Sequence, residues 1–248
     1  MKTAVALTFT ADGYRKYAKN CLALIEKHWP WDVDVFAYPE NFELHGRELH
    51  RVCPELVDFK ARMERRPSAH GVRGQTYFYT YDAVKWCHRI FALKAAADES
   101  DAQILINMDA DIVTFGDVTH EFLEGILGDA DIAYMPRHAI KMYSECSFVL
   151  YRLENPLVRK FINDHQEMYT SGEIFQLMQW TDCHAFDHLL AGAQLKVRDI
   201  NAGIPASMHP FVNGPLGSVM DHLKGPRKLE GHSRPNDLVV TRQEAYWA

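Results

Sequence analysis

The chain has 248 residues, enough for one large domain or two small ones and enough to bury a sizeable core. Hydrophobic residues make up 47% and charged residues 24%, which excludes a disordered or low-complexity protein. The formal net charge of −6 argues against nonspecific binding to nucleic acid or to an anionic membrane.

Strand-like and helix-like patterns alternate along the chain. A continuous apolar and β-branched run predicts a first strand over Ala4–Thr10, and apolar residues at helical spacing predict a helix over Tyr14–His28. The polar, basic stretch Glu55–Gln75 contains a proline and two glycines, and we expect it to form a long loop. The other predicted strands are Asp32–Tyr38, Ala102–Met108, Ala130–Met135, Ser147–Leu153 and Lys196–Ile200. The other predicted helices are Asp82–Ala97, Asp117–Leu127, Pro156–Tyr169 and Thr181–Ala191.

This alternation predicts βαβ units joined by right-handed crossovers. We therefore expect an α/β fold with a mostly parallel, mixed central sheet that is flanked by helices. The sequence has neither an internal repeat nor a long linker, so we expect a single domain over residues 1–248. From Asn201 onward the chain is rich in Gly, Pro and His with little regular pattern, and we expect residues 201–248 to form a tail that folds back on the domain.

The cellular compartment is indicated by what the sequence lacks. Its five cysteines are scattered and contain no CxxC pair, which argues against a disulfide framework and against a zinc ribbon. The first residues, MKTAVALTFTADGY, lack the basic region and cleavage pattern of a signal peptide, and no stretch approaches 18 apolar residues. We therefore predict a cytoplasmic protein without a transmembrane segment. The sequence carries no signal for an oligomeric state.

Two carboxylates, Asp109 and Asp111, follow the buried-looking strand Ala102–Met108. Ligands of open α/β sheets bind at the carboxyl ends of the strands. Two carboxylates held this close repel each other unless they share a cation, and oxygen ligands favour Mg²⁺ or Mn²⁺. The D-x-D triplet is also common in solvated turns, so by itself it leaves both interpretations open.

A second pattern, His222-x-x-Gly225-x-x-Lys228, lies far along the chain. A histidine can complete a Mn²⁺ site, and the cations Lys224, Arg227 and Lys228 suit a diphosphate. Gly225 permits close approach of the backbone to such a group. The same residues would also form an ordinary basic surface turn. The combination of the two patterns favours a metal–diphosphate site.

A strand that ends in D-x-D and a later H-x-x-G-x-x-K resemble the nucleotide-sugar-dependent glycosyltransferases of GT-A (Rossmann-like) fold, especially the glycogenin-like retaining group. The resemblance extends from residue 3 to about residue 230 as pattern and order. It implies transfer of a sugar from a nucleotide diphosphate donor, a UDP-sugar, to a carbohydrate or glycoconjugate acceptor with retention. It also implies one GT-A-like domain whose tail, residues 201–248, folds back over the donor site.

The resemblance also implies roles for individual residues. Metal ligands for Mn²⁺ (or Mg²⁺) are Asp109, Asp111 and His222. Nucleoside-binding residues are Thr8, Phe9 and Thr10, and Tyr14 either stacks on the base or packs at the helix start. Diphosphate-binding residues are Lys224, Gly225 and Lys228, and Asp109 also contacts the donor. Candidate catalytic residues are Arg89, on the helix that faces the donor; Asp182, near the anomeric carbon; and Glu145, at the floor of the sugar pocket.

Other patterns have two interpretations each. His184 and His188, beside Cys183, suggest either zinc binding or a structural pair on one helix face, and we expect Asp187 to be a solvated helix residue. The aromatic run Tyr77–Tyr81 suggests either an acceptor groove or core packing.

Several functions are excluded and two rivals stay open. The sequence has no G-x-x-x-x-G-K-[ST], no G-x-S-x-G and no dinucleotide fingerprint after its first strand, which excludes P-loop NTPases, α/β-hydrolases and ordinary Rossmann dehydrogenases. One rival is a sugar nucleotidyltransferase, which also uses a strand-end carboxylate pair and Mg²⁺. The other is a non-catalytic protein of the same fold that binds a carbohydrate or a partner.

Overall fold

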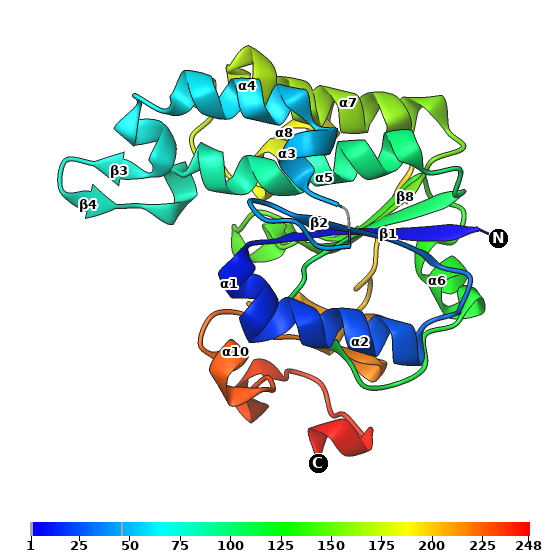
Figure 1. Cartoon of the computed structure of the whole chain (residues 1–248). Coiled ribbons are helices and arrows are strands. Elements are labelled where there is room, and N and C mark those ends of the chain that lie inside the picture. Colours follow the sequence, from blue (N-terminus) through cyan, green and yellow to red (C-terminus); the bar gives the residue numbers. More distant parts are fainter. Residues whose placement is uncertain (1, 46) are drawn as a thin grey trace.

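The computed structural model describes residues 2–45 and 47–248 (Figure 1). Six strands of this part of the chain form the main sheet in the order β2-β1-β5-β8-β7-β9. These strands are β1 Thr3–Phe9, β2 Asp34–Pro39, β5 Ile104–Met108, β7 Ile132–Met135, β8 Glu145–Arg152 and β9 Val197–Asp199. The longer helices are α2 Lys19–His28, α4 Pro54–Met63, α5 Ala83–Glu99, α6 His120–Leu127, α7 Pro156–Ser171 and α8 Asp182–Gly192.

The sheet is mixed. β1 pairs in parallel with β2 and with β5, and β7 pairs in parallel with β9. β8 runs antiparallel to its neighbours β5 and β7. The predicted α/β fold with a mostly parallel, mixed sheet flanked by helices is therefore confirmed.

Helices cover both faces of the sheet, so its central strands are buried on both sides. Figure 1 shows α4, α5 and α7 on one face and α2 and α6 on the other. Alternate residues of β1 divide accordingly: Ala4 and Ala6 pack with α5 and α7, whereas Val5 and Leu7 pack with α2 and α6. This two-sided burial explains why β1 and β5 are almost continuous apolar runs in the sequence.

A second, two-stranded sheet ties the C-terminal segment to the region after β5. β10 (Met220–His222) pairs antiparallel with β6 (Ile112–Thr114), and His222 lies opposite Ile112. The segment expected to have little regular pattern therefore contains a strand. Short helices α9 (Pro210–Asn213) and α10 (Arg227–Glu230) flank it. The pairing brings β10 directly beside the D-x-D triplet.

The prediction of a long loop over Glu55–Gln75 is wrong for the first part of this stretch. Residues Pro54–Met63 form α4, with proline in the first turn, where a missing N–H costs nothing. Leu56, Phe59 and Met63 are buried at helical spacing against α5 and α7. The polar residues of α4 are on its solvent side, which masked this apolar face. The rest of the stretch forms a short 3₁₀ turn and a hairpin of β3 (Val72–Arg73) and β4 (Thr76–Tyr77) that projects from the body in Figure 1.

Within residues 2–45 and 47–248, no helix combines the length and the apolar character that a bilayer crossing needs.

Candidate active site

Three potential metal ligands converge where β5 ends. Asp109 directly follows β5, Asp111 lies between β5 and β6, and His222 ends β10. One ligand atom from each lies within 4.8 Å of the others. His222 Nε2 is 3.3 Å from Asp109 Oδ2 and 3.2 Å from Asp111 Oδ1. The strand pairing thus brings together residues that the sequence separates by half of the chain. Two carboxylates and one imidazole are a donor set that suits Mn²⁺ or Mg²⁺.

Opposite charges hold this cluster together. Asp111 is buried, which opposes ionisation, but His222 and Lys228 outweigh burial and lower the pKa of the carboxyl. Lys228 Nζ lies 2.8 Å from Asp111 Oδ2. Burial acts against the charged form of His222 as well, yet the two aspartates raise its pKa to about 9. The cluster therefore pairs each carboxylate with a cation.

Arg89 on α5 connects the cluster to the start of α8. Its Nη1 lies 2.8 Å from Asp109 Oδ1 and 3.3 Å from Asp182 Oδ2, and its Nη2 donates to the carbonyl of Cys146. Asp182 is the first residue of α8, where the hydroxyl of Thr181 caps the helix by accepting from the His184 N–H. This arrangement fixes the Asp182 carboxylate beside the candidate metal ligands.

Glu145 begins β8 and is buried beside cations. It pairs with Lys224 Nζ, and its Oε2 is 3.4 Å from Arg137 Nη1. Burial alone would raise its pKa, but Lys224, His222 and Arg137 lower it to about 2. Glu145 is therefore a carboxylate at neutral pH, and it holds the Lys224 side chain in place.

All these groups line one cavity of about 790 Å³, which is within the usual range for small-molecule sites. The predicted site residues that line it are Thr8, Arg89, Asp109, Asp111, Glu145, Asp182, His222, Lys224, Gly225 and Lys228. Gly225 has a φ of +56°, a left-handed conformation that favours glycine.

Three predicted nucleoside-binding residues lie outside the cavity lining as the described residues define it. Phe9 is buried and stacks on Tyr14 with ring centroids 5.6 Å apart. The hydroxyl of Thr10 accepts from the Gly13 N–H at 3.0 Å and caps the short helix α1 (Ala11–Gly13). These residues support the backbone next to Thr8.

The cavity also contains residues that the sequence analysis did not single out. Arg137 comes just after β7, so the rule that ligands meet strand ends would have found it. Tyr17, Tyr143 and Met208 also line the cavity, and no local pattern marks them.

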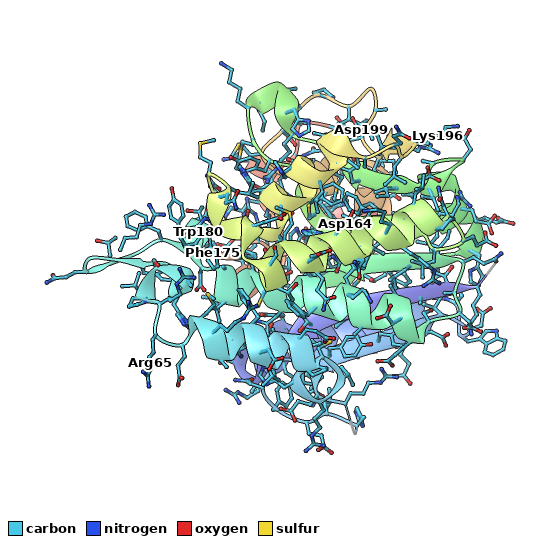
Figure 2. The ribbon with its side chains drawn as sticks, turned by 90° about the horizontal axis from the view of Figure 1, so that it is seen from above. Arg65, Asp164, Phe175, Trp180, Lys196 and Asp199 are labelled. Atoms are coloured by element: carbon cyan, nitrogen blue, oxygen red, sulfur yellow. The ribbon has the colours of Figure 1, made fainter. Side chains whose placement is uncertain are left out.

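Two expectations about polar and aromatic side chains are resolved. The expectation that Asp187 is solvated is wrong, because its carboxylate accepts from the backbone N–H and the hydroxyl of Ser144 at 2.9 and 2.5 Å. Its partner lies 43 positions away, which no local pattern reveals. Of the aromatic run, Tyr77, Phe78 and Tyr79 are exposed, whereas Tyr81 packs against the core beside Trp180, which Figure 2 labels next to Phe175.

Comparison with protein-family models gives no match, and neither does comparison with curated proteins. Similar solved structures include the glycosyltransferase GlyE of Streptococcus pneumoniae TIGR4, with 11% identity, a TM-score of 0.49, and coverage of 80% of this chain and 45% of GlyE. Mouse xyloside xylosyltransferase 1 has 13% identity and a TM-score of 0.45, with coverage of 81% of this chain and 85% of the mouse protein. Galactosyltransferase LgtC, in complex with donor and acceptor sugar analogues, has 14% identity and a TM-score of 0.47, with coverage of 90% of this chain and 87% of LgtC. The chain spans less than half of the length of GlyE.

Proposed function

We propose that this protein is a metal-dependent glycosyltransferase that moves a sugar from a UDP-sugar to a carbohydrate or glycoconjugate acceptor with retention. One observation carries the proposal: the D-x-D triplet and the segment His222–Lys228 meet in one cavity, with ligands for a cation and lysines for a diphosphate. In this proposal residues 1–248 form a single GT-A-like domain, and residues 201–248 close over the donor.

The chemical requirement is stabilisation of the leaving group, because negative charge grows on the diphosphate as the bond to the sugar breaks. Asp109, Asp111 and His222 would hold Mn²⁺ (or Mg²⁺), which supplies a fixed positive charge beside the diphosphate. Lys224 and Lys228 would add cations that are already in position, and Gly225 would let the backbone approach the phosphates. Thr8 would contact the nucleoside, with Phe9, Thr10 and Tyr14 supporting that wall.

Arg89 and Asp182 would act at the sugar end. Arg89 orients both Asp109 and Asp182, so it links the position of the cation to that of the sugar. Asp182 would orient the transferred sugar or the acceptor hydroxyl. The acceptor oxygen bonds to the anomeric carbon on the face that the diphosphate leaves. The bond from that carbon to the phosphate oxygen breaks, and this oxygen takes the acceptor proton. Glu145 would position Lys224.

Coupling between metal and nucleotide tests the proposal. Two carboxylates and one imidazole would leave a bound cation with room for further ligands, which diphosphate oxygens could supply. Each of the two, cation and nucleotide, should then raise the affinity for the other by the same factor. At about 100 times its Kd, one ligand adds about 2.7 kcal/mol to the free energy of unfolding. This corresponds to a rise in Tm of roughly 5–10 °C for a chain of this size.

We expect UDP and Mn²⁺ together to raise Tm by more than the sum of their separate effects. Melting curves with UDP, with Mn²⁺, with both and with neither measure this, and GDP is the control nucleotide. Strictly additive shifts would contradict a shared metal–diphosphate site. If GDP with Mn²⁺ stabilises the protein and UDP does not, the metal–diphosphate site stands but the donor is a GDP-sugar.

A further inference from the structure

The segment after β10 forms a loop whose two ends meet. We call residues 223–232 the diphosphate loop; they include Lys224 and Lys228, which line the cavity. Among residues 2–45 and 47–248, this loop has one backbone hydrogen bond to a distant part of the chain: the Leu223 N–H donates to the carbonyl of Asp111 at 3.0 Å. The place of the loop relative to the candidate metal site therefore depends on side-chain contacts.

Asp221 lies at the base of the diphosphate loop, inside the protein. It precedes His222 in β10 and is fully buried. Its carboxylate accepts three hydrogen bonds: from the backbone N–H of Ser233 at 2.7 Å, from the Ser233 hydroxyl at 2.6 Å and from the Tyr246 hydroxyl at 3.0 Å. Hydrogen bonds to a charged group are about twice as strong as those between neutral groups. These bonds therefore join the residue after the loop firmly to the strand before it.

His209 adds a second connection across the base of the loop. Its Nε2 lies 3.0 Å from the carbonyl oxygen of His222 and 3.1 Å from the hydroxyl oxygen of Ser233. A carbonyl oxygen only accepts, so Nε2 carries the proton and donates it. His209 thus ties the backbone of a candidate metal ligand to the residue that closes the loop.

Tyr246 comes from the C-terminal segment, which in Figure 1 lies on the same side of the sheet as α2 and α10. Its ring stacks on that of Phe115, just after β6, with centroids 4.1 Å apart and planes 5° from parallel. The neighbouring Trp247 donates its indole N–H to the carbonyl of Gly217 at 2.8 Å. The Tyr246 hydroxyl is therefore held by contacts outside the loop, and it also lies 3.4 Å from the carbonyl oxygen of Gly231, within the loop.

We infer that Asp221, Ser233 and Tyr246 are positioning residues, which hold the diphosphate loop in its ligand-binding conformation before a donor arrives. This inference rests on the proposed function and adds three residues that lie outside the cavity lining as the described residues define it. A shift of the loop backbone would displace both Lys224 and Lys228 and would weaken binding without removing either cation. A loop that is already ordered also lowers the entropic cost of binding the diphosphate.

The competing interpretation is a network that only stabilises the fold. Such a network would lower the free energy of unfolding and leave the affinity for every ligand unchanged. A comparison of UDP with uridine separates the two interpretations, because uridine has no phosphates that the loop could bind.

Calorimetry of the full chain with Tyr246→Phe tests the inference, because this variant loses the hydroxyl and keeps the ring that stacks on Phe115. We expect it to bind UDP, with Mn²⁺ present, about three- to tenfold more weakly. This is less than the value of a direct hydrogen bond to a charged group, about ten- to hundredfold, because both lysines stay. Uridine binding should change by less than about twofold. Ser233→Ala, which also removes one hydroxyl bond to Asp221, should give the same pattern.

Tyr38→Phe is the matched control. The Tyr38 hydroxyl also donates to a carboxylate at 3.0 Å, that of Glu99, and Tyr38 lies outside the cavity lining. The control therefore loses the same kind of hydrogen bond at a distance from the loop, and it should bind UDP and uridine as the unchanged protein does.

Hydrogen exchange of the chain without ligand gives a readout that needs no nucleotide. Tyr246→Phe and Ser233→Ala should speed amide exchange in residues 223–232 by about threefold or more, because they free the loop to open locally. Exchange in β5 and α5 should stay the same, and Tyr38→Phe should leave the loop unaffected.

Three results would overturn the inference. UDP affinity is unchanged in both Tyr246→Phe and Ser233→Ala, or UDP and uridine are weakened equally, or exchange in residues 223–232 stays the same. The two proposals fail in different ways. If the unchanged protein binds no UDP with Mn²⁺, the proposed function is rejected, and hydrogen exchange still decides whether these residues order the loop. If it binds UDP and the variants bind it equally well, the positioning role alone is rejected.

Discussion

Asp111 lies between two cations, His222 and Lys228, and shares His222 with Asp109. Its carboxylate therefore contacts two cations, as the carboxylate of Asp109 does through Arg89 and His222. Removing its charge without changing its shape separates metal binding from packing. The carboxamide of asparagine keeps the size of the side chain but gives a cation a neutral oxygen.

We predict that Asp111→Asn abolishes Mn²⁺-dependent binding of UDP while the protein stays folded. Loss of a residue that only orients a metal ligand already costs about 10–100-fold in metal affinity, so loss of a ligand itself should cost more than about 100-fold. Calorimetry of Mn²⁺ with UDP measures the effect, and circular dichroism checks the fold. Asp117→Asn is the matched control, because the Asp117 side chain is largely exposed and lies outside the cavity lining. Near-normal affinity in Asp111→Asn would remove the metal assignment.

At the scale of elements, the segment from β10 to α10 does two things. β10 is a buried strand, and the residues after it carry Lys224 and Lys228 into the cavity. A deletion of the whole segment would uncover β6, so a loss of ligand binding could not be separated from a loss of stability. A single lysine is the sharper probe, because Lys228 is partly exposed and lies on a short helix.

Lys228→Ala should weaken the binding of UDP much more than the binding of uridine. A hydrogen bond to a charged group raises affinity by about ten- to hundredfold. Uridine has no phosphates, so it makes no such bond with Lys228 and its affinity should not change. Competition calorimetry in the presence of Mn²⁺ compares the two ligands, and Lys27→Ala, at the end of α2, provides a control. An equal loss for both ligands would assign Lys228 a structural role instead.

The helix α4 lies in a stretch that we expected to form a loop, and its packing can be measured. Phe59 is buried and packs against Phe91 and Tyr169, with ring centroids 6.4 and 6.0 Å away. Phe59→Ala should lower the free energy of unfolding by about 3–5 kcal/mol, as expected for a buried phenylalanine. Val57→Ala, on the exposed side of the same helix, should change it by less than about 0.5 kcal/mol. Urea denaturation distinguishes the two, and equal effects would mean that α4 does not pack as described.

At the scale of the whole molecule, buried neutral histidines make the fold sensitive to acid. Burial lowers the pKa of His165 and of His209 to about 3 and that of His88 to about 4. In the unfolded chain a histidine takes up its proton near pH 6.5. The stability that these groups contribute is therefore complete above pH 6.5 and is lost as the pH falls toward 3–4.

His165 offers the clearest test, because both of its ring nitrogens lack a partner among the described residues and its neighbours are Phe161 and Phe186. Between pH 7.5 and 4.5 its share of the lost stability is about 2–3 kcal/mol. His165→Leu, similar in volume, should reduce the fall in the free energy of unfolding by about that amount. Urea denaturation at both pH values measures it. His188→Leu replaces an exposed histidine and should behave like the unchanged protein. An unchanged pH dependence in His165→Leu would show that other groups cause the acid sensitivity.

The α/β class, most of the strands and helices, and the two patterns that supply the candidate metal and diphosphate ligands can be predicted from the amino-acid sequence. These features are local: a buried strand is an unbroken apolar run, and a D-x-D at its end is visible within eight residues, Ile104–Asp111. Three features become visible in the folded chain alone: β10 pairs with β6, Arg89 joins Asp109 to Asp182, and Ser144 donates to Asp187. The folded chain also shows which aromatic side chains line the cavity. The physical reason is that short strands and buried polar groups gain their stability from partners far away in the chain, so nothing in their own neighbourhood records the contact.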